Sequence, residues 1–344
     1  MAPTQLKTLQ IGRGIAALAV CAYHLSVLME RHGDSTFTVW AERGFLGVDF
    51  FFVLSGFIIL HAHRKDLGRP AKVGAYAYKR FARVYPIYWI YTAVLVAALY
   101  VGIGSAEWIP RTAADWIKTI TLVRITPGET PLFVAWTLFH EIVFYAVFAV
   151  MILNLRAGLA LLVVWFVGIC AYHTYPELTP IGSVLGLYNL NFLIGMLAFL
   201  AAPRLGPRTA LAVGLAGLLL FAATYAANPE LHGPGRLLYA AAFGLILAGA
   251  VGVERRRPVN APLLSLLGDA SYTIYLTHEL ILTAGYRVVT RFVQPPAVVL
   301  YPALFVGTAA AGVVLYLCLE RPLLNRMRKK RAPAPEAAAV KAAV

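Results

Sequence analysis

The sequence predicts an all-α, polytopic integral membrane protein with about ten transmembrane helices and both termini in the cytoplasm. Three observations support this prediction: 60% of the 344 residues are hydrophobic, 13% are charged, and the mean hydropathy is +0.71. Soluble domains carry about a quarter charged residues and less than half apolar ones, so the apolar solvent of this chain must be lipid. The three cysteines also fall inside apolar runs, which favours packing over a disulfide or metal site.

A membrane-spanning helix needs about 20 mostly apolar residues, and ten such runs follow one another along the chain. They lie near 11–29, 44–61, 84–104, 134–153, 157–175, 184–201, 208–228, 236–253, 270–290 and 297–319. The first run lacks a small-residue cleavage pattern and is expected to stay as a helix. The pair 134–153 and 157–175, joined around Arg156, is the place where a miscount is easiest.

Two segments lie outside this pattern of apolar runs. The connection between the third and fourth runs mixes aromatic, apolar and charged residues, which is typical of an interfacial segment. Its large apolar members are Trp108, Trp116, Ile117 and Ile120. The C-terminal segment is rich in Lys, Arg, Ala and Pro. We therefore expect a transmembrane domain over residues 1–325 and a basic, disordered cytoplasmic tail over 326–344.

The net charge of +14 comes from 30 Lys and Arg against 16 Asp and Glu. A basic balance can indicate nucleic acid, but these cations occupy short loops between apolar runs, a pattern typical of membrane orientation. With a cytoplasmic N-terminus and ten helices, 22 of the 30 cations lie on the cytoplasmic side and eight outside. An odd count would put the basic tail or the Arg255 cluster outside. The bias predicts an even count, an inner-membrane location and no nucleic-acid partner.

Ionisable residues inside apolar runs are informative because each is costly in lipid unless it faces other helices or a wet cavity. His24, Asp49 and Glu141 lie in the first, second and fourth runs, and the predicted topology puts all three in the outer half of the membrane. His278 and Glu279 lie in the ninth run. A shared depth is what a site requires, so the sequence predicts a site built from His24 with Glu141 or Asp49.

Structural alternatives exist for each of these residues. His24 and His278 could each merely hydrogen-bond a neighbouring helix. Asp49 could be a helix-pairing acid, since the nearby Gly47 and Gly56 suggest tight packing. A carboxylate in lipid needs a partner or a proton, so Asp49 and Glu141 are the residues least easily dismissed.

A second set of polar residues lies at the predicted cytoplasmic side. Arg13 begins the first run, and Arg80 and Arg83 are three residues apart, on one face if the segment is helical. Arg13 and His24 share a helix face at a separation of about 16 Å. Arginine suits phosphate because its fork donates two parallel hydrogen bonds. The positive-inside bias alone could also explain Arg80 and Arg83.

These residues fall in blocks that resemble the membrane-bound acyltransferase family 3, which includes O-acetyltransferases of bacterial surface polysaccharides. The blocks are LQIGRGIAALAVCAYH (Leu9–His24), GVDFFFVLSGFII (Gly47–Ile59), YKRFARVYPIYW (Tyr78–Trp89), AWTLFHEIVFY (Ala135–Tyr145), LGDASYTIYLTHELI (Leu267–Ile281) and YLCLERPL (Tyr316–Leu323). Their order covers almost the whole chain. We expect no hydrolase-like domain after the tenth run, which would be a departure from larger members of the family. The general character resembles that of exopolysaccharide acetyltransferases such as those of succinoglycan.

The resemblance implies transfer of an acyl group, usually acetyl, from coenzyme A, with no metal. It implies that His24 and Arg13 are essential and that Arg80 and Arg83 contact the acyl-CoA donor. Glu141 takes the place of the family's fourth-helix acid. The full predicted site is His24, Glu141 and Asp49 as catalytic residues, and Arg13, Arg80, Arg83, Ser55 and Tyr275 as donor-binding residues.

The predicted function is therefore that of a membrane-bound O-acyltransferase, which uses cytoplasmic acetyl-CoA as donor and a carbohydrate as acceptor. Its expected surroundings are the lipid bilayer and proteins of polysaccharide biosynthesis or export. In this mechanism His24 acts as general base or carries a covalent acetyl group, and Glu141 orients it. Two alternatives stay open. One is a transporter or flippase, because intramembrane His and carboxylates also build proton relays. The other is a non-catalytic partner of an export machine.

Overall fold

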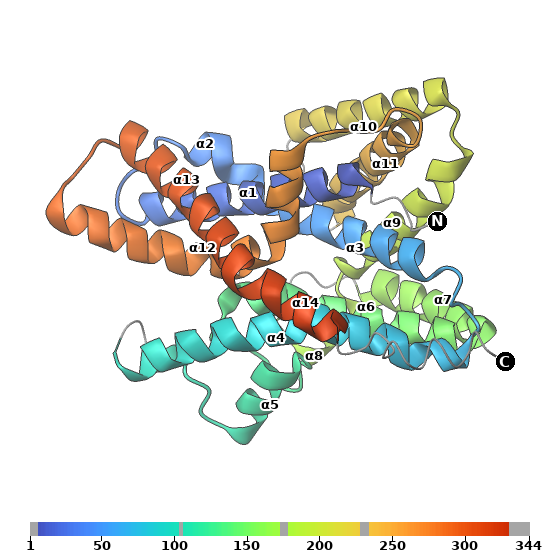
Figure 1. Ribbon diagram of the computed structural model, residues 1–344, viewed down its shortest axis with the longest axis horizontal. Coiled ribbons are helices and arrows are strands. Elements are labelled where there is room, and N and C mark those ends of the chain that lie inside the picture. The colour runs from blue at the N-terminus through green and yellow to red at the C-terminus, as the bar shows by residue number, and fades with distance from the viewer. Residues whose placement is uncertain (1–5, 103–105, 173–177, 228–233, 330–344) are drawn as a thin grey trace.

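The computed structural model describes residues 6–102, 106–172, 178–227 and 234–329, and within these ranges every regular element is helical (Figure 1). The long helices are α1 (Lys7–Glu30), α3 (Gly47–His63), α4 (Val73–Tyr100), α6 (Trp136–Leu153), α7 (Leu155–Tyr172), α9 (Asn189–Ala201), α10 (Pro207–Ala227), α11 (Leu237–Glu254), α12 (Pro262–Phe292) and α13 (Ala297–Leu315). The short ones are α2 (Thr38–Ala41), α5 (Ala113–Thr121), α8 (Pro180–Leu185) and α14 (Arg321–Lys329). The predicted all-α class is confirmed.

Across the described residues, nine stretches are long and apolar enough to cross a membrane. They include all the predicted runs except 270–290, which is also a long helix, α12, but carries too many polar and charged side chains to meet the same criterion. This polarity has a structural reason, because α12 packs between α1 and α13 and turns its polar residues toward other helices. The protein is a polytopic membrane protein.

Several predicted boundaries were wrong. The third helix begins at Val73 rather than near residue 84, so the basic segment with Arg80 and Arg83 is helical and lies within α4 rather than before it. A proline removes only one hydrogen bond, and Pro86 lies within this 28-residue helix without ending it. The run 184–201 is divided between α8 and α9. The pair around Arg156 does form two helices, α6 and α7.

Both ends of the described chain lie at the same face of the helix bundle. The backbone amide of Lys7 donates to Glu254, 2.6 Å away at the end of α11, and the Tyr78 hydroxyl donates to the Met327 carbonyl at 3.1 Å. This agrees with an even number of crossings; that this face is cytoplasmic stays a prediction. Helix α14 extends to Lys329, four residues into the range predicted to be disordered, and residues 330–344 lie outside the described part.

Small residues bring the site-bearing helices together. A Cβ atom added at Gly56 of α3 would overlap the backbone carbonyl of Phe192 in α9, and one at Gly268 of α12 would overlap that of Gln10 in α1. Only glycine permits such close approach, and small residues of this kind drive helix packing in membranes. The tight packing predicted around Gly47 and Gly56 is confirmed, since Gly47 likewise lies against the Ala16 carbonyl.

The predicted interfacial segment contains a short amphipathic helix, α5. The Thr112 side chain caps its start by accepting from the backbone amide of Asp115, and Leu122, with φ of 54°, ends it in the left-handed region. Ile117 and Ile120 are about half exposed on one side. Tyr88 of α4 donates its hydroxyl to the Thr119 carbonyl at 2.7 Å, which anchors α5 against the bundle.

Candidate active site

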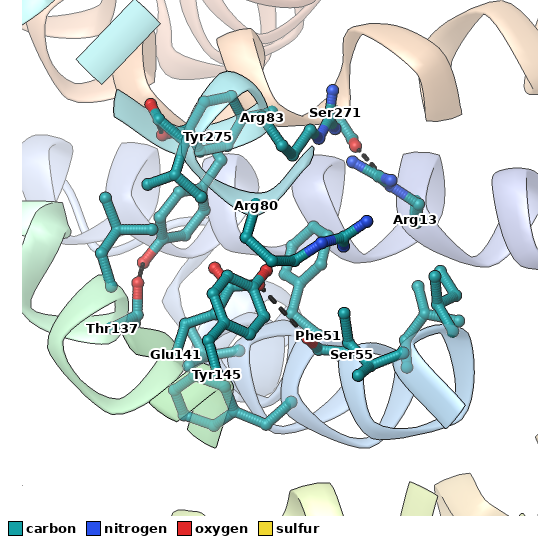
Figure 2. A pocket seen from close by; sticks show the side chains of 18 residues that line it. Arg13, Phe51, Ser55, Arg80, Arg83, Thr137, Glu141, Tyr145, Ser271 and Tyr275 are labelled. Carbon is teal, nitrogen blue, oxygen red and sulfur yellow. Dashed lines mark hydrogen bonds between the residues drawn. The ribbon is translucent and has the colours of Figure 1, made fainter. Parts of the chain in front are cut away.

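A cavity of about 120 Å³ lies where α1, α3, α4, α6 and α12 meet. Three arginines line it, Arg13 from α1 with Arg80 and Arg83 from α4, and Glu141 and Tyr145 of α6 face them. Figure 2 shows these side chains directed into the same space. The sequence predicted that the three arginines would gather, and the structure brings them together in what we call the arginine cavity.

The three arginines differ in whether their guanidinium N–H groups have hydrogen-bond acceptors in the protein. Arg13 Nε donates to Ser271 Oγ at 3.1 Å, and Arg83 Nη1 donates at 2.5 Å to Glu320, a fully buried carboxylate. Arg80 Nε is buried and has no hydrogen-bond acceptor among the described residues, while its guanidinium lies 5.7 Å from the centre of the Tyr145 ring. A buried donor without an acceptor is costly. Arg80 is therefore the arginine most available to a ligand.

Glu141 faces the arginines and is held by two hydroxyl groups. Ser55 Oγ donates to its Oε1 at 3.2 Å, and the Tyr145 hydroxyl donates to the same oxygen. Since Ser55 is on α3 and Tyr145 is one turn along α6, the carboxylate is fixed in position at the cavity wall. Six of the eight predicted site residues line this cavity: Arg13, Ser55, Arg80, Arg83, Glu141 and Tyr275.

His24 does not line the arginine cavity. Its Nδ1 lies 3.0 Å from the Val20 carbonyl and 3.2 Å from His278 Nε2, and its Nε2 lies 3.7 Å from Glu279. The predicted pairing of His24 with Glu141 or Asp49 was wrong, because both acids have other partners. The reason is depth along the helices: Glu141 lies beside Ser55 and the arginines, whereas His24 is nearly three turns farther along α1 from Arg13.

The hydrogen bonds around the two histidines favour one tautomer for each ring. His278 Nδ1 lies 2.7 Å from the Tyr275 carbonyl, which can only accept, so His278 carries its proton on Nδ1 and its Nε2 accepts. The nearest donor to that Nε2 is His24 Nδ1. A neutral His24 then keeps its proton on Nδ1 and presents an Nε2 lone pair on the side of Glu279. That nitrogen can act as a base.

Tyr275 and Phe51 stand between the arginine cavity and the histidine pair. Both rings line the cavity, with centroids 5.8 Å apart, and the Tyr275 ring is also 5.8 Å from that of His278. The Tyr275 hydroxyl lies 3.0 Å from Thr137 Oγ1 and 3.0 Å from the Val134 carbonyl, which ties α12 to the start of α6. The two halves of the site are thus neighbours separated by one layer of side chains.

Asp49 belongs to a separate buried cluster. Arg236 Nε and Nη2 donate to its two carboxylate oxygens at 2.9 and 2.6 Å, and Asn191 Nδ2 donates at 3.0 Å. Asp49 is 1% exposed and links α3 to α9 and the start of α11. This geometry supports the helix-pairing alternative, in place of the predicted catalytic role.

Sequence reasoning noted His278 and Glu279 but assigned them no role beside His24. Depth could not select them, because several ionisable residues share the same half of the membrane. The available signal was their position in the C-terminal block, one turn after Tyr275, on the helix that the sequence shows to be the least apolar of the ten. Their contact with His24 arises from the close packing of α1 on α12.

Comparison with known proteins places the chain in a family. A family described as an acyltransferase domain matches residues 6–317. The exopolysaccharide production protein ExoZ of Rhizobium meliloti (strain 1021) is 30% identical over 310 residues, which cover 85% of this chain and 93% of that protein. The peptidoglycan O-acetyltransferase OatA of Listeria monocytogenes serovar 1/2a is 25% identical over 313 residues, which cover 79% of this chain and 48% of that protein.

This chain thus spans about half the length of the Listeria relative and nearly all of the Rhizobium one. No solved structure matches the chain. Since the family match runs through all the helices that form the arginine cavity and the histidine pair, the chain is an acyltransferase and belongs to this acyltransferase family, as its motifs predicted.

Proposed function

We propose that the protein transfers an acyl group, acetyl in the simplest case, from acyl-CoA to a hydroxyl group of a cell-surface carbohydrate. The observation that carries the proposal is the arginine cavity, in which three cations from two helices face one space inside a membrane protein. Charges are costly there and are kept for function. The names of the two relatives, one in exopolysaccharide production and one in peptidoglycan O-acetylation, support a carbohydrate acceptor.

The donor would enter from the face that carries the basic segment of α4, which we take to be cytoplasmic. Acyl-CoA carries phosphates, and guanidinium groups bind phosphate through paired hydrogen bonds. A cavity of about 120 Å³ is smaller than the ~300–1,000 Å³ of pockets that enclose a whole drug-sized ligand. It would therefore hold part of the donor, with Arg80 as the first contact and the remainder along α4.

Transfer would take place at His24. Its Nε2 accepts the proton of the acceptor hydroxyl as that oxygen attacks the thioester carbonyl carbon. The carbon–sulfur bond then breaks, the thiolate of CoA takes the proton from the imidazolium, and an ester remains on the sugar. His278 holds His24 in the reactive tautomer, and the Glu279 carboxylate, 3.7 Å from Nε2, stabilises the imidazolium.

The thioester must pass the layer formed by Phe51 and Tyr275 to reach His24. Rotation of these two aromatic side chains would join the arginine cavity to the histidine pair without moving a helix. Glu141 then acts at the donor side, where it holds Tyr145 and Ser55 and balances the charge of the arginines. Its role is to shape the donor site rather than to orient His24.

The proposal is tested with the purified protein in lipid nanodiscs, labelled acetyl-CoA and de-O-acetylated exopolysaccharide. We expect label on the polysaccharide together with free CoA. His24→Ala should reduce transfer by about 10²–10⁴-fold, the usual contribution of general acid–base catalysis, with acyl-CoA binding unchanged. His32→Ala, an exposed histidine farther along the chain, is the matched control. Normal transfer by His24→Ala would show that the proposed chemistry is wrong, and absence of CoA release from wild type would favour a transporter.

A further inference from the structure

A second cavity, of about 590 Å³, lies beside α5 in the connection between α4 and α6. Its volume is within the ~300–1,000 Å³ typical of small-molecule sites. Polar and charged side chains and one large aromatic ring line it: Glu107, Trp108, Arg111, Asp115, Lys118 and Glu129. We call it the α5 cavity. None of its lining residues lines the arginine cavity, so the two cavities are separate.

The wall of the α5 cavity is held in place by buried charged groups. Lys118 is 2% exposed, and its Nζ donates to the Pro127 carbonyl at 2.9 Å and lies 3.2 Å from Asp115. Arg124 is also buried, donates from Nε to Ser183 at 2.8 Å, and lies over the Phe139 ring. Such contacts hold the loop in one conformation before any ligand arrives.

One polar group in this wall lacks a partner. Thr119 lines the cavity and is 1% exposed, and its hydroxyl has no hydrogen-bond partner within the described ranges. A buried hydroxyl without a partner costs free energy, which a ligand with hydroxyl groups of its own would recover. This observation is independent of the charged residues around it and indicates that a polar ligand belongs here.

The wall of the α5 cavity continues toward the helix that carries the histidine partner of His24. The segment that lines the cavity at Pro131 continues to Val134, whose carbonyl accepts from the Tyr275 hydroxyl at 3.0 Å, one turn before His278 on α12. Burial raises the pKa of the Glu129 carboxyl, and the negative charge of Glu279 raises it further. Glu279 in turn lies 3.7 Å from His24 Nε2. The wall of the α5 cavity is therefore joined, through the residues after Pro131, to the helix that carries His278 and Glu279. The approach is from the α4–α6 connection, whose helix α5 is hydrogen-bonded to Tyr85, Tyr88 and Trp89 of α4.

The lining chemistry suits a saccharide. Carboxylates accept hydrogen bonds from hydroxyl groups, lysine and arginine donate to them, and an aromatic ring such as Trp108 covers the apolar face of a sugar ring. The three acids and two cations nearly balance, so the cavity does not attract a polyanion such as CoA. We propose that the α5 cavity is the acceptor site, which binds a polysaccharide segment and presents one hydroxyl to His24 beside Glu129 and Glu279.

This inference rests on the proposed acyltransfer to carbohydrate, and its test separates donor binding from acceptor binding. Steady-state transfer is measured in nanodiscs with labelled acetyl-CoA and de-O-acetylated exopolysaccharide, each varied in turn. Glu129→Gln and Trp108→Ala should each raise the KM for polysaccharide by about three- to tenfold, the effect of losing one hydrogen bond or packing contact, with the KM for acetyl-CoA unchanged. Glu42→Gln and Trp40→Ala, exposed residues between α1 and α3, are the matched controls.

The outcomes distinguish the two claims. If the wild type transfers acetyl and both cavity variants have the same KM for polysaccharide as the controls, the acceptor site alone is overturned. A wild type that neither binds acetyl-CoA nor transfers label would overturn the proposed function and this site with it. If Trp108→Ala reduces the yield of folded protein, Trp108→Phe keeps the ring and should restore the KM for polysaccharide, which a general folding defect would not explain.

Discussion

Two clusters of charged side chains lie within the apolar helices of this protein, and they differ in how completely they are satisfied. Around Asp49, the carboxylate receives hydrogen bonds from Arg236 and Asn191, and the Arg236 guanidinium also lies between the Phe45 and Tyr188 rings. In the arginine cavity, Arg80 keeps a buried donor without an acceptor among the described residues. One cluster is closed and the other is open.

The difference separates structural from functional charges in a membrane protein. The free-energy cost of removing a charge from water is offset only when the protein replaces the hydrogen bonds that water made. The Asp49 cluster replaces them within the protein, which joins α3, α9 and α11. In the arginine cavity, some hydrogen bonds of the guanidinium groups are not replaced, and a donor that carries phosphates could supply them. Arginines and acids in apolar helices can thus have either a structural or a functional role, and their hydrogen bonds distinguish the two.

The largest expected effect is on stability, at the closed cluster. Asp49→Ala leaves Arg236 buried without its carboxylate and should lower the free energy of unfolding by about 3–5 kcal/mol. Thermal unfolding of the purified protein in detergent measures this, with Glu30→Ala, an exposed acid at the end of α1, as the control. If Asp49→Ala is as stable as the control but inactive, Asp49 belongs to the catalytic site after all and the comparison fails.

The next effect is on donor binding, at the open cluster. Arg80→Ala should raise the KM for acyl-CoA by about 10- to 100-fold, because a charge-assisted hydrogen bond contributes about 1.5–3 kcal/mol. Stability should change little, since the Nε of Arg80 has no acceptor among the described residues and the guanidinium contact with the Tyr145 ring is the contact that is lost. Lys79→Ala, an exposed neighbour, tests whether any cation on this segment would serve. If the two variants raise the KM for acyl-CoA equally, Arg80 has no specific role in donor binding and the positive-inside bias alone explains its presence.

The smallest effect is expected in the layer between the arginine cavity and the histidines. Tyr275→Phe keeps the ring but removes the hydroxyl that contacts Thr137 and Val134, which should cost about 0.5–1.5 kcal/mol of stability. The KM for acyl-CoA should stay near that of wild type, because the arginines are untouched. A large rise in that KM would show that Tyr275 itself binds the donor, as the sequence predicted.

Much of the fold could be read from the sequence because its signals are local. Ten apolar runs, the place of the basic clusters and the mixed aromatic and charged composition of the α5 region were all visible without coordinates. Boundaries were less accurate where helices extend beyond their apolar stretches. Helix α4 begins at Val73 and α12 at Pro262, about three and two turns before the predicted starts, and the added turns of α4 carry Arg80 and Arg83.

The candidate site was only partly predictable. The gathering of Arg13, Arg80 and Arg83 followed from their blocks, but the assignment of partners to His24 did not. Helix periodicity places a residue on a face and at a depth, and several acids met both conditions for His24. Glu279 rather than Glu141 lies beside His24 because α1 packs against α12.

By itself, the sequence determined that this chain spans a membrane, which family it resembles and which ionisable residues must be sheltered from lipid, because hydropathy and charge are properties of short segments. Only the tertiary structure decided which of those residues meet. Contacts at Gly56 and Gly268 set how closely and at what rotation α3 and α12 pack on their neighbours. That rotation sends Asp49 to Arg236 and His24 to His278, since a side chain can satisfy its charge only with a group within a few ångströms.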